Sequence, residues 1–143
     1  MKKLLLFTLT MLMLLTACNF QSAATSAPKT TEEASSEKTS LNYQQITQDE
    51  AKQIMKDEDN YIILDVRTQS EYDDGHIPNA VCVPNETIGG DDIPELPDKE
   101  QLILVYCRSG RRSKEAAAKL ADMGYTNIKE FGGIIDWTGD VIK

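Results

Sequence analysis

Cysteine and histidine are scarce in this sequence, and their scarcity limits the chemistry that the protein can use. Its 143 residues include three cysteines and a single histidine, His76. After Cys18 only Cys82 and Cys107 remain. Two cysteines are too few for a disulfide scaffold, and these two do not have the spacing of metal ligands. We therefore expect no metal site and no other cofactor, so side chains have to carry any catalytic chemistry.

Positive charge is also in short supply. Lysine and arginine together number 15 against 23 acidic residues, and the formal net charge is −8. Proteins that bind a phosphate backbone or an anionic membrane surface present an excess of positive charge. The composition therefore argues against a nucleic-acid partner, and a local group of arginines at residues 108–112 stands out against it.

Long apolar runs are absent except for one at the N-terminus. After a basic start, Leu4 to Leu15 is almost unbroken, too short to cross a bilayer comfortably but of the proportions of a signal-peptide core. The run ends in Leu15-Thr16-Ala17-Cys18, which resembles the lipobox of bacterial lipoproteins, whose cysteine is acylated after cleavage. We predict a signal peptide over residues 1–17 and a lipid anchor at Cys18, with an ordinary secretory signal as the alternative.

The segment after Cys18 is polar. Gln21 to Ser40 is rich in Ser, Thr, Ala, Glu and Lys and has no large apolar residue, so it cannot bury enough surface to offset its ordering entropy. We predict a flexible, lipid-anchored tether over residues 18–40 and a monomeric folded domain over 41–143. The protein is then expected to be extracytoplasmic and held at the cell membrane.

Within residues 41–143 short apolar runs alternate with helical segments. Capping-box spacing at Thr47 to Glu50 predicts a helix through Lys56, and Gly124 is expected to cap a later one. Residues 85–100, rich in Gly, Pro and acidic side chains, predict a surface loop. Further predicted elements are strands at 61–66, 80–83, 101–106 and 127–131, a short helix at 70–74, and a terminal helical segment containing Trp137. This alternation favours an α/β class: a small, mostly parallel sheet flanked by helices on both faces.

The segment Cys-Arg-Ser-Gly-Arg-Arg-Ser, residues 107–113, is the main candidate site. Cys107 ends a buried strand, and a turn containing Gly110 leads into an alanine-rich helix, so backbone N–H groups are expected to converge on one point. Arg108, Arg111 and Arg112 add fixed positive charge, and such surroundings stabilise a thiolate at neutral pH. We interpret Cys107 as a nucleophile in an anion-binding loop. A purely structural role is less attractive because arginines in a first helical turn oppose the helix dipole.

Three other residues have competing interpretations. Cys82, in a Val-Cys-Val strand, is most simply a small buried hydrophobe, or alternatively a resolving thiol for Cys107. The position of His76 between Gly75 and Pro78 indicates a turn-forming role rather than a catalytic base. Arg67 has the spacing to pair with Glu71, four residues on.

Three segments in order resemble the rhodanese family, in its single-domain sulfurtransferase form. They are LDVRTQSEYDDGHIPNAVCVP (64–84), YCRSGRRS (106–113) and MGYTNIKEFGGIIDW (123–137), and together they span most of 41–143. The resemblance implies a rhodanese-like fold and a Cys107 that takes sulfur from an anionic donor such as thiosulfate, forms a persulfide, and passes the sulfur to a thiol or cyanide. It further implies that the donor is bound by Arg108, Ser109, Gly110, Arg111 and Arg112.

Loop length separates this chemistry from a related one. Rhodanese-like phosphatases place five residues between cysteine and arginine, whereas here Ser113 stands at that position and Arg112 comes one residue early. Phosphatase activity is therefore not expected. Two alternatives to a sulfurtransferase stay open: a non-catalytic sulfur carrier or anion-binding module, and a thiol redox protein that uses Cys107 with Cys82.

Overall fold

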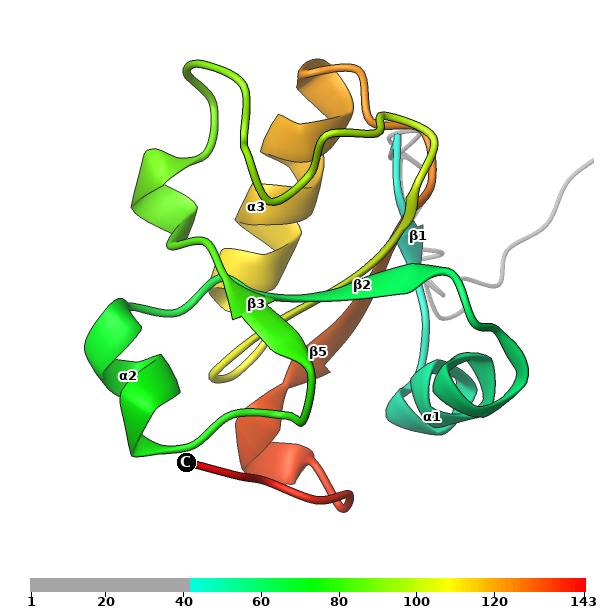
Figure 1. Cartoon of the computed structure of the whole chain (residues 1–143), viewed down its shortest axis with the longest axis vertical. Coiled ribbons are helices and arrows are strands. Elements are labelled where there is room, and N and C mark those ends of the chain that lie inside the picture. The colour runs from blue at the N-terminus through cyan, green and yellow to red at the C-terminus, as the bar shows by residue number, and fades with distance from the viewer. Residues whose placement is uncertain (1–41) are drawn as a thin grey trace, which may run out of the picture. The chain divides into compact units, whose positions relative to one another are not determined.

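Five parallel strands form the centre of residues 42–143, the part of the chain that the computed structural model describes. The strand order is β1-β5-β4-β2-β3, and each neighbouring pair is parallel (Figure 1). The strands are β1 (Gln44–Gln45), β2 (Tyr61–Asp65), β3 (Ala80–Cys82), β4 (Leu102–Cys107) and β5 (Ile128–Gly133). Because β4 is the middle strand, its last residue lies at the centre of the sheet's carboxyl edge, where open parallel sheets bind ligands.

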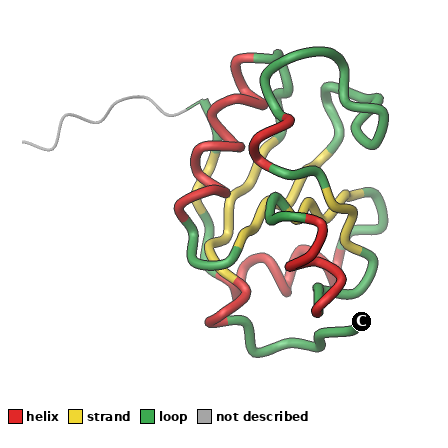
Figure 2. Tube along the Cα trace, turned by 90° about the vertical axis from the view of Figure 1, so that its left-hand side faces the viewer, coloured by secondary structure: helices red, strands yellow, loops and turns green. Residues whose placement is uncertain are grey.

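Three helices flank this sheet: α1 (Gln48–Asp57), α2 (Gln69–Asp74) and α3 (Arg111–Asp122). Thr47 begins α1 with the predicted capping box, in which its side chain accepts from the Glu50 N–H and Glu50 reaches back to the Thr47 N–H. Thr68 and Glu71 form the same motif at α2. Figures 1 and 2 show helices on both sides of the strands, so the predicted α/β arrangement is confirmed.

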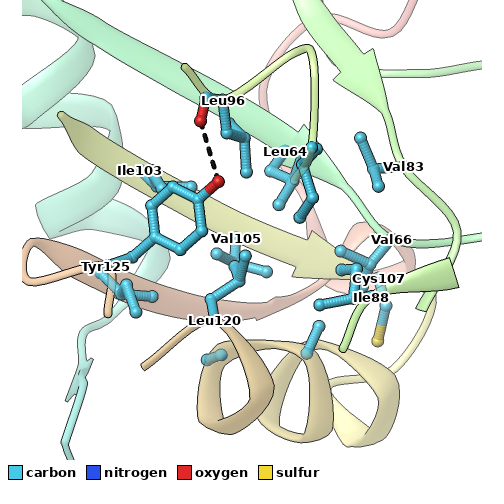
Figure 3. Close-up of a cluster of buried hydrophobic side chains, with 14 residues drawn as sticks. Leu64, Val66, Val83, Ile88, Leu96, Ile103, Val105, Cys107, Leu120 and Tyr125 are labelled. Atoms are coloured by element: carbon cyan, nitrogen blue, oxygen red, sulfur yellow. Dashed lines mark hydrogen bonds between the residues drawn. The ribbon is translucent and has the colours of Figure 1, made fainter. Parts of the chain in front are cut away.

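Alternate residues of β4 feed two hydrophobic layers, one on each face. Val105 packs with Leu64 and Leu120 on the α3 face (Figure 3), whereas Leu104 and Phe131 belong to the layer beneath α1 and α2. Each such side chain that is fully buried contributes about 1.5–3 kcal/mol to folding. Burial on both faces explains why the central strands are continuous apolar runs.

The structure corrects the sequence predictions at three places. Residues 85–100 form an irregular loop with one 3₁₀ turn (Asn85–Thr87), but it is not all at the surface: Ile88, Ile93 and Leu96 are buried. The strand β1 was not predicted because its two residues are exposed and polar. The terminal helical segment is a single 3₁₀ turn (Ile134–Asp136) that ends before Trp137.

The predicted signal peptide, the acylated Cys18 and the tether over residues 18–40 lie outside the described residues. Within residues 42–143, none of the helices has the length and apolar character needed to cross a bilayer.

Candidate active site

Cys107 is the last residue of β4, and its side chain is only 1% exposed. It pairs with Gly133 of β5 across an irregularity in the ladder that starts after Val105. The sulfur lies at one end of the hydrophobic layer that packs under α3 (Figure 3). A buried sulfur at the sheet's carboxyl edge is where the sequence predicted the nucleophile.

The turn after Cys107 folds back so that a backbone donor reaches the sulfur. Gly110 adopts a left-handed φ of 94°, a conformation that L side chains rarely adopt, and its N–H donates to Cys107 Sγ at 3.1 Å. The helix α3 begins at the next residue, and Lys114 N–H bonds the Gly110 carbonyl at 3.4 Å. The Gly110 N–H can therefore stabilise negative charge on the Cys107 sulfur.

The Gly132-Gly133 turn packs directly against this loop. A Cβ atom at Gly133 would lie 2.3 Å from the carbonyl oxygen of Arg108 and 2.6 Å from Ser109 Cα, both main-chain atoms. Ile135 N–H also donates to the Arg108 carbonyl at 3.2 Å. The end of β5 thus fixes the position of the loop's backbone, and only glycine permits so close an approach.

Two of the three loop arginines already have carboxylate partners. Arg111 is 74% exposed and pairs with Glu115 at 2.6 Å along α3. Arg112 donates two hydrogen bonds, of 2.7 and 2.8 Å, to Glu71 of α2. The hydrogen bonds from Arg112 lower the pKa of Glu71 from 4.5 to about 2.

Arg108 faces a different environment. It lines a hollow of about 240 Å³ together with Glu71, Asp74 and the exposed Ile135. Ser109 and Gly110 line a second hollow, of about 420 Å³, on the β5 side of the loop. The five predicted donor-binding residues therefore follow Cys107 in one loop, but Arg108 lines one hollow and Ser109 and Gly110 line another.

The family of this domain follows from a match over residues 47–140 to the rhodanese-like domain. The chain is a member of the rhodanese family. Its relatives include the thiosulfate sulfurtransferase PspE of Escherichia coli, 34% identical over 51% of this chain and 70% of that protein. A sulfurtransferase of Allochromatium vinosum is 35% identical over 65% of this chain and 86% of its own.

Solved structures agree with this membership. A rhodanese from E. coli, determined with anions, is 31% identical and covers 58% of this chain and 98% of its own, with a TM-score of 0.54. The BH2092 protein of Bacillus halodurans is 30% identical over 71% of this chain and 77% of its own, with a TM-score of 0.61. The fold is thus rhodanese-like, and the relatives support a sulfurtransferase activity at the family level.

One predicted ion pair in the rhodanese domain is wrong. Arg67 pairs with the fully buried Asp65, through Nε at 2.9 Å and Nη2 at 2.6 Å, and it also donates to the Gly75 carbonyl. Glu71, the predicted partner, instead caps α2 and pairs with Arg112, 41 residues away. Arg67 and Asp65 therefore brace the β2–α2 turn beside the site.

Cys82 lies too far from Cys107 for a direct disulfide in this rhodanese fold. Its strand β3 is separated from β4 by β2, with Cys82 opposite Asp65 and Asp65 opposite Tyr106. Two strand spacings amount to about 10 Å, beyond the roughly 7 Å that a disulfide spans between Cα atoms. Cys82 also points to the opposite face, and burial together with Asp65 raises the pKa of its thiol to about 11.

His76 has the structural surroundings expected of a turn residue. Its ring stacks on Tyr72 at 3.7 Å between centroids, and Nδ1 hydrogen-bonds the Tyr72 carbonyl at 3.0 Å. Its backbone pairs with Ile142 in both directions. These contacts tie the α2–β3 turn to the C-terminal segment.

Sequence reasoning included Ser113 in the loop without giving it a role, and it missed Glu130 altogether. Ser113 is fully buried in the first turn of α3, and its Oγ lies 3.5 Å from Cys107 Sγ. Glu130, 2% exposed on β5, accepts a hydrogen bond of 2.6 Å from the same Oγ. The sequence did carry a signal for Glu130. Side chains two residues apart in a strand lie on the same face, so Glu130 shares the core-facing side of β5 with Ile128, an unusual position for a carboxylate.

Proposed function

We propose that this rhodanese domain is a sulfurtransferase in which Cys107 carries the transferred sulfur as a persulfide. The observation that supports it most is the Gly110 N–H, 3.1 Å from a buried sulfur at the end of the central strand. Such a donor stabilises sulfur anions, whether thiolate or persulfide. The sulfurtransferases among its relatives support the same chemistry.

The reaction divides into two displacements. The Cys107 thiolate attacks the outer sulfur of a donor such as thiosulfate, a new S–S bond forms, and the donor's S–S bond breaks as sulfite leaves with the electron pair. A thiolate or cyanide acceptor then attacks the outer sulfur of the persulfide, and the Cys107 thiolate departs. Covalent catalysis of this kind replaces one difficult transfer by two easier ones.

The loop residues have different parts in this proposal. Arg108, which faces the 240 Å³ hollow, offers the charge that attracts an anionic donor. Arg112 contributes less free charge, because Glu71 already occupies two of its donors. Gly110 supplies the main-chain N–H that contacts the sulfur, and Ser109 precedes it in the same turn. Arg111 is exposed and paired with Glu115, so its contribution to donor binding is small.

The surroundings of Ser113 weigh against phosphoryl transfer. A rhodanese-like phosphatase has an arginine at this position, but the Ser113 side chain points into the protein toward Glu130. A buried carboxylate at that place would repel a phosphate. The distance between Cys82 and Cys107 likewise weighs against a direct dithiol mechanism.

The test is turnover of thiosulfate and cyanide to thiocyanate by the purified protein. We expect Cys107→Ser to abolish turnover with an unchanged circular dichroism spectrum, and the matched Cys82→Ser variant to keep it. Retained turnover in Cys107→Ser would refute the proposal. A persulfide that forms on Cys107 without turnover would instead favour a sulfur carrier that needs its own acceptor protein.

We also propose, on the sequence alone, that the protein is a lipoprotein anchored through Cys18 on the outer side of the cell membrane. Lipid attached to two sites on Cys18 would hold it stably, because one acyl chain gives only marginal binding. Mass analysis of the N-terminal peptide from bacterial membranes tests this, and an unmodified Cys18 would contradict it.

A further inference from the structure

The Ser113 side chain links a buried carboxylate, that of Glu130, to the Cys107 sulfur. Cys107 Sγ is 3.5 Å from Ser113 Oγ, and Ser113 Oγ is 2.6 Å from Glu130 Oε1. The three residues are 1%, 0% and 2% exposed, respectively. Burying a carboxylate costs several kcal/mol unless hydrogen bonds offset the loss of water, so the partners of Glu130 matter.

The hydrogen-bond pattern fixes where the Ser113 hydrogen points. Glu130 Oε1 also accepts from Gly132 N–H at 2.9 Å, so this oxygen acts as an acceptor twice. A hydroxyl carries one hydrogen and two lone pairs, and the 2.6 Å contact has the length of a hydroxyl donating to a carboxylate. The competing acceptors, the carbonyls of Gly110 and Gly132, are longer at 3.0 and 3.3 Å.

With its hydrogen directed at Glu130, Ser113 meets the Cys107 sulfur with a lone pair. A lone pair can accept the S–H hydrogen of a thiol, but it repels a thiolate. We propose that Glu130 is a positioning residue for Cys107: through Ser113 it favours the protonated sulfur and so sets the pH at which the sulfur becomes nucleophilic. Its effect opposes that of the Gly110 N–H, which also contacts the sulfur.

Other charged groups also lie near Cys107 and Glu130. On the side of α2, Glu71 pairs with Arg112, which interacts electrostatically with Cys107, and Arg108 is the neighbouring charge in the loop. Toward Glu130, the hollow of about 420 Å³ carries Lys114 and the exposed Asp136 on its wall. Further titratable groups near these are Tyr43, whose pKa is raised by burial and by Glu130, the Arg111–Glu115 pair, and Glu86, which acts on Arg112.

The test is the pH profile of Cys107 alkylation by iodoacetamide, measured on the Cys82→Ser background so that one thiol in residues 42–143 reacts. Glu130→Gln keeps an oxygen that can accept from Ser113 and Gly132 but removes the charge. If the introduced amide instead turns its NH2 group toward Ser113, that group becomes the donor, and the Ser113 hydroxyl is free to donate to the sulfur. Both arrangements favour the anion, and we expect the midpoint to move to lower pH.

Ser113→Ala distinguishes a route through the hydroxyl from the effect of charge alone. In that background Glu130→Gln should shift the midpoint less than it does alone, because only the loss of charge remains and the route through the hydroxyl is gone. Asp136→Asn, which removes an exposed carboxylate from the same hollow, should leave the profile in place. An unmoved or raised midpoint in Glu130→Gln, or an equal shift with and without Ser113, would overturn the inference.

The inference rests on Cys107 being the nucleophile of the proposed function, but alkylation needs no sulfur donor. A shifted profile without persulfide formation would refute the sulfurtransferase and leave Glu130 in its role. Persulfide formation with an unmoved profile would do the reverse.

Discussion

Gly133→Ala is the substitution whose effect the structure defines most sharply. Gly133 has an ordinary backbone conformation, with φ −125° and ψ 146°, so alanine meets no torsional penalty there. The added Cβ would nevertheless lie 2.3 Å from the Arg108 carbonyl oxygen and 2.6 Å from Ser109 Cα. Because both neighbours are main-chain atoms, a side-chain rotation cannot relieve the contact.

Relief requires β5 and the Cys107 loop to separate by about 1 Å. Overpacking of this kind costs about 1–3 kcal/mol of folding free energy. The separation also disturbs the Ile135 N–H bond to the Arg108 carbonyl and the aim of the Gly110 N–H at the sulfur. A misplacement of about 1 Å in a reacting group can reduce a rate about 100-fold, and we expect a loss of that order in sulfur transfer.

Gly132→Ala is the matched control. Gly132 has a φ of 94°, and a Cβ there meets no atom within 4 Å, so alanine brings torsional strain without a clash. That strain costs about 1–2 kcal/mol. The two variants should therefore lose similar stability in urea denaturation, while the rate per folded molecule falls much further in Gly133→Ala. Equal rates in the two variants would refute the view that contact with β5 positions the loop.

Three further predictions follow from single contacts. The pKa of Glu71 is depressed to about 2, so its bond with Arg112 stabilises the fold above about pH 4.5 and is lost as pH falls toward 2. In urea denaturation, the free energy of unfolding should therefore fall more steeply over this pH range in the wild type than in Arg112→Ala. Parallel curves for the two proteins would contradict the pairing. Cys82→Ala should keep the wild-type rate of sulfur transfer. Peroxide treatment of the native wild type should yield no Cys82–Cys107 disulfide by mass analysis, and the appearance of that disulfide would contradict the described strand order. Thr47→Ala should lower the free energy of unfolding by about 1 kcal/mol through loss of the cap, and an unchanged urea midpoint would count against the capping box.

The fold was largely predictable because its signals are local. The apolar runs at 61–66 and 101–106 have strand length and no polar alternation, which is typical of strands covered on both faces. The capping box at Thr47 likewise needs only neighbouring residues. The burial of Ile93 and Leu96 was not predictable, because their spacing in a loop rich in glycine and proline follows no period.

The place of Cys107 at the sheet's carboxyl edge was predictable from the loop sequence, but the charge balance around it was not. Arg112 and Glu71 are 41 residues apart, and only the packing of α2 beside the loop brings them together. Local spacing suggested Arg67 as the partner of Glu71 and was misleading, since the buried Asp65 competes more strongly for that guanidinium. Ser113 and Glu130 meet across α3 and β5, a contact that depends on the register of β5 against β4.

The most direct test of sulfur transfer through Cys107 is mass analysis of the purified protein before and after exposure to thiosulfate, with peptide mapping of the added mass. We expect one added sulfur atom on the Cys107 peptide, released on addition of cyanide or a thiol. Added sulfur on Cys82 alone, or no added sulfur on a folded protein with a free Cys107, would contradict it.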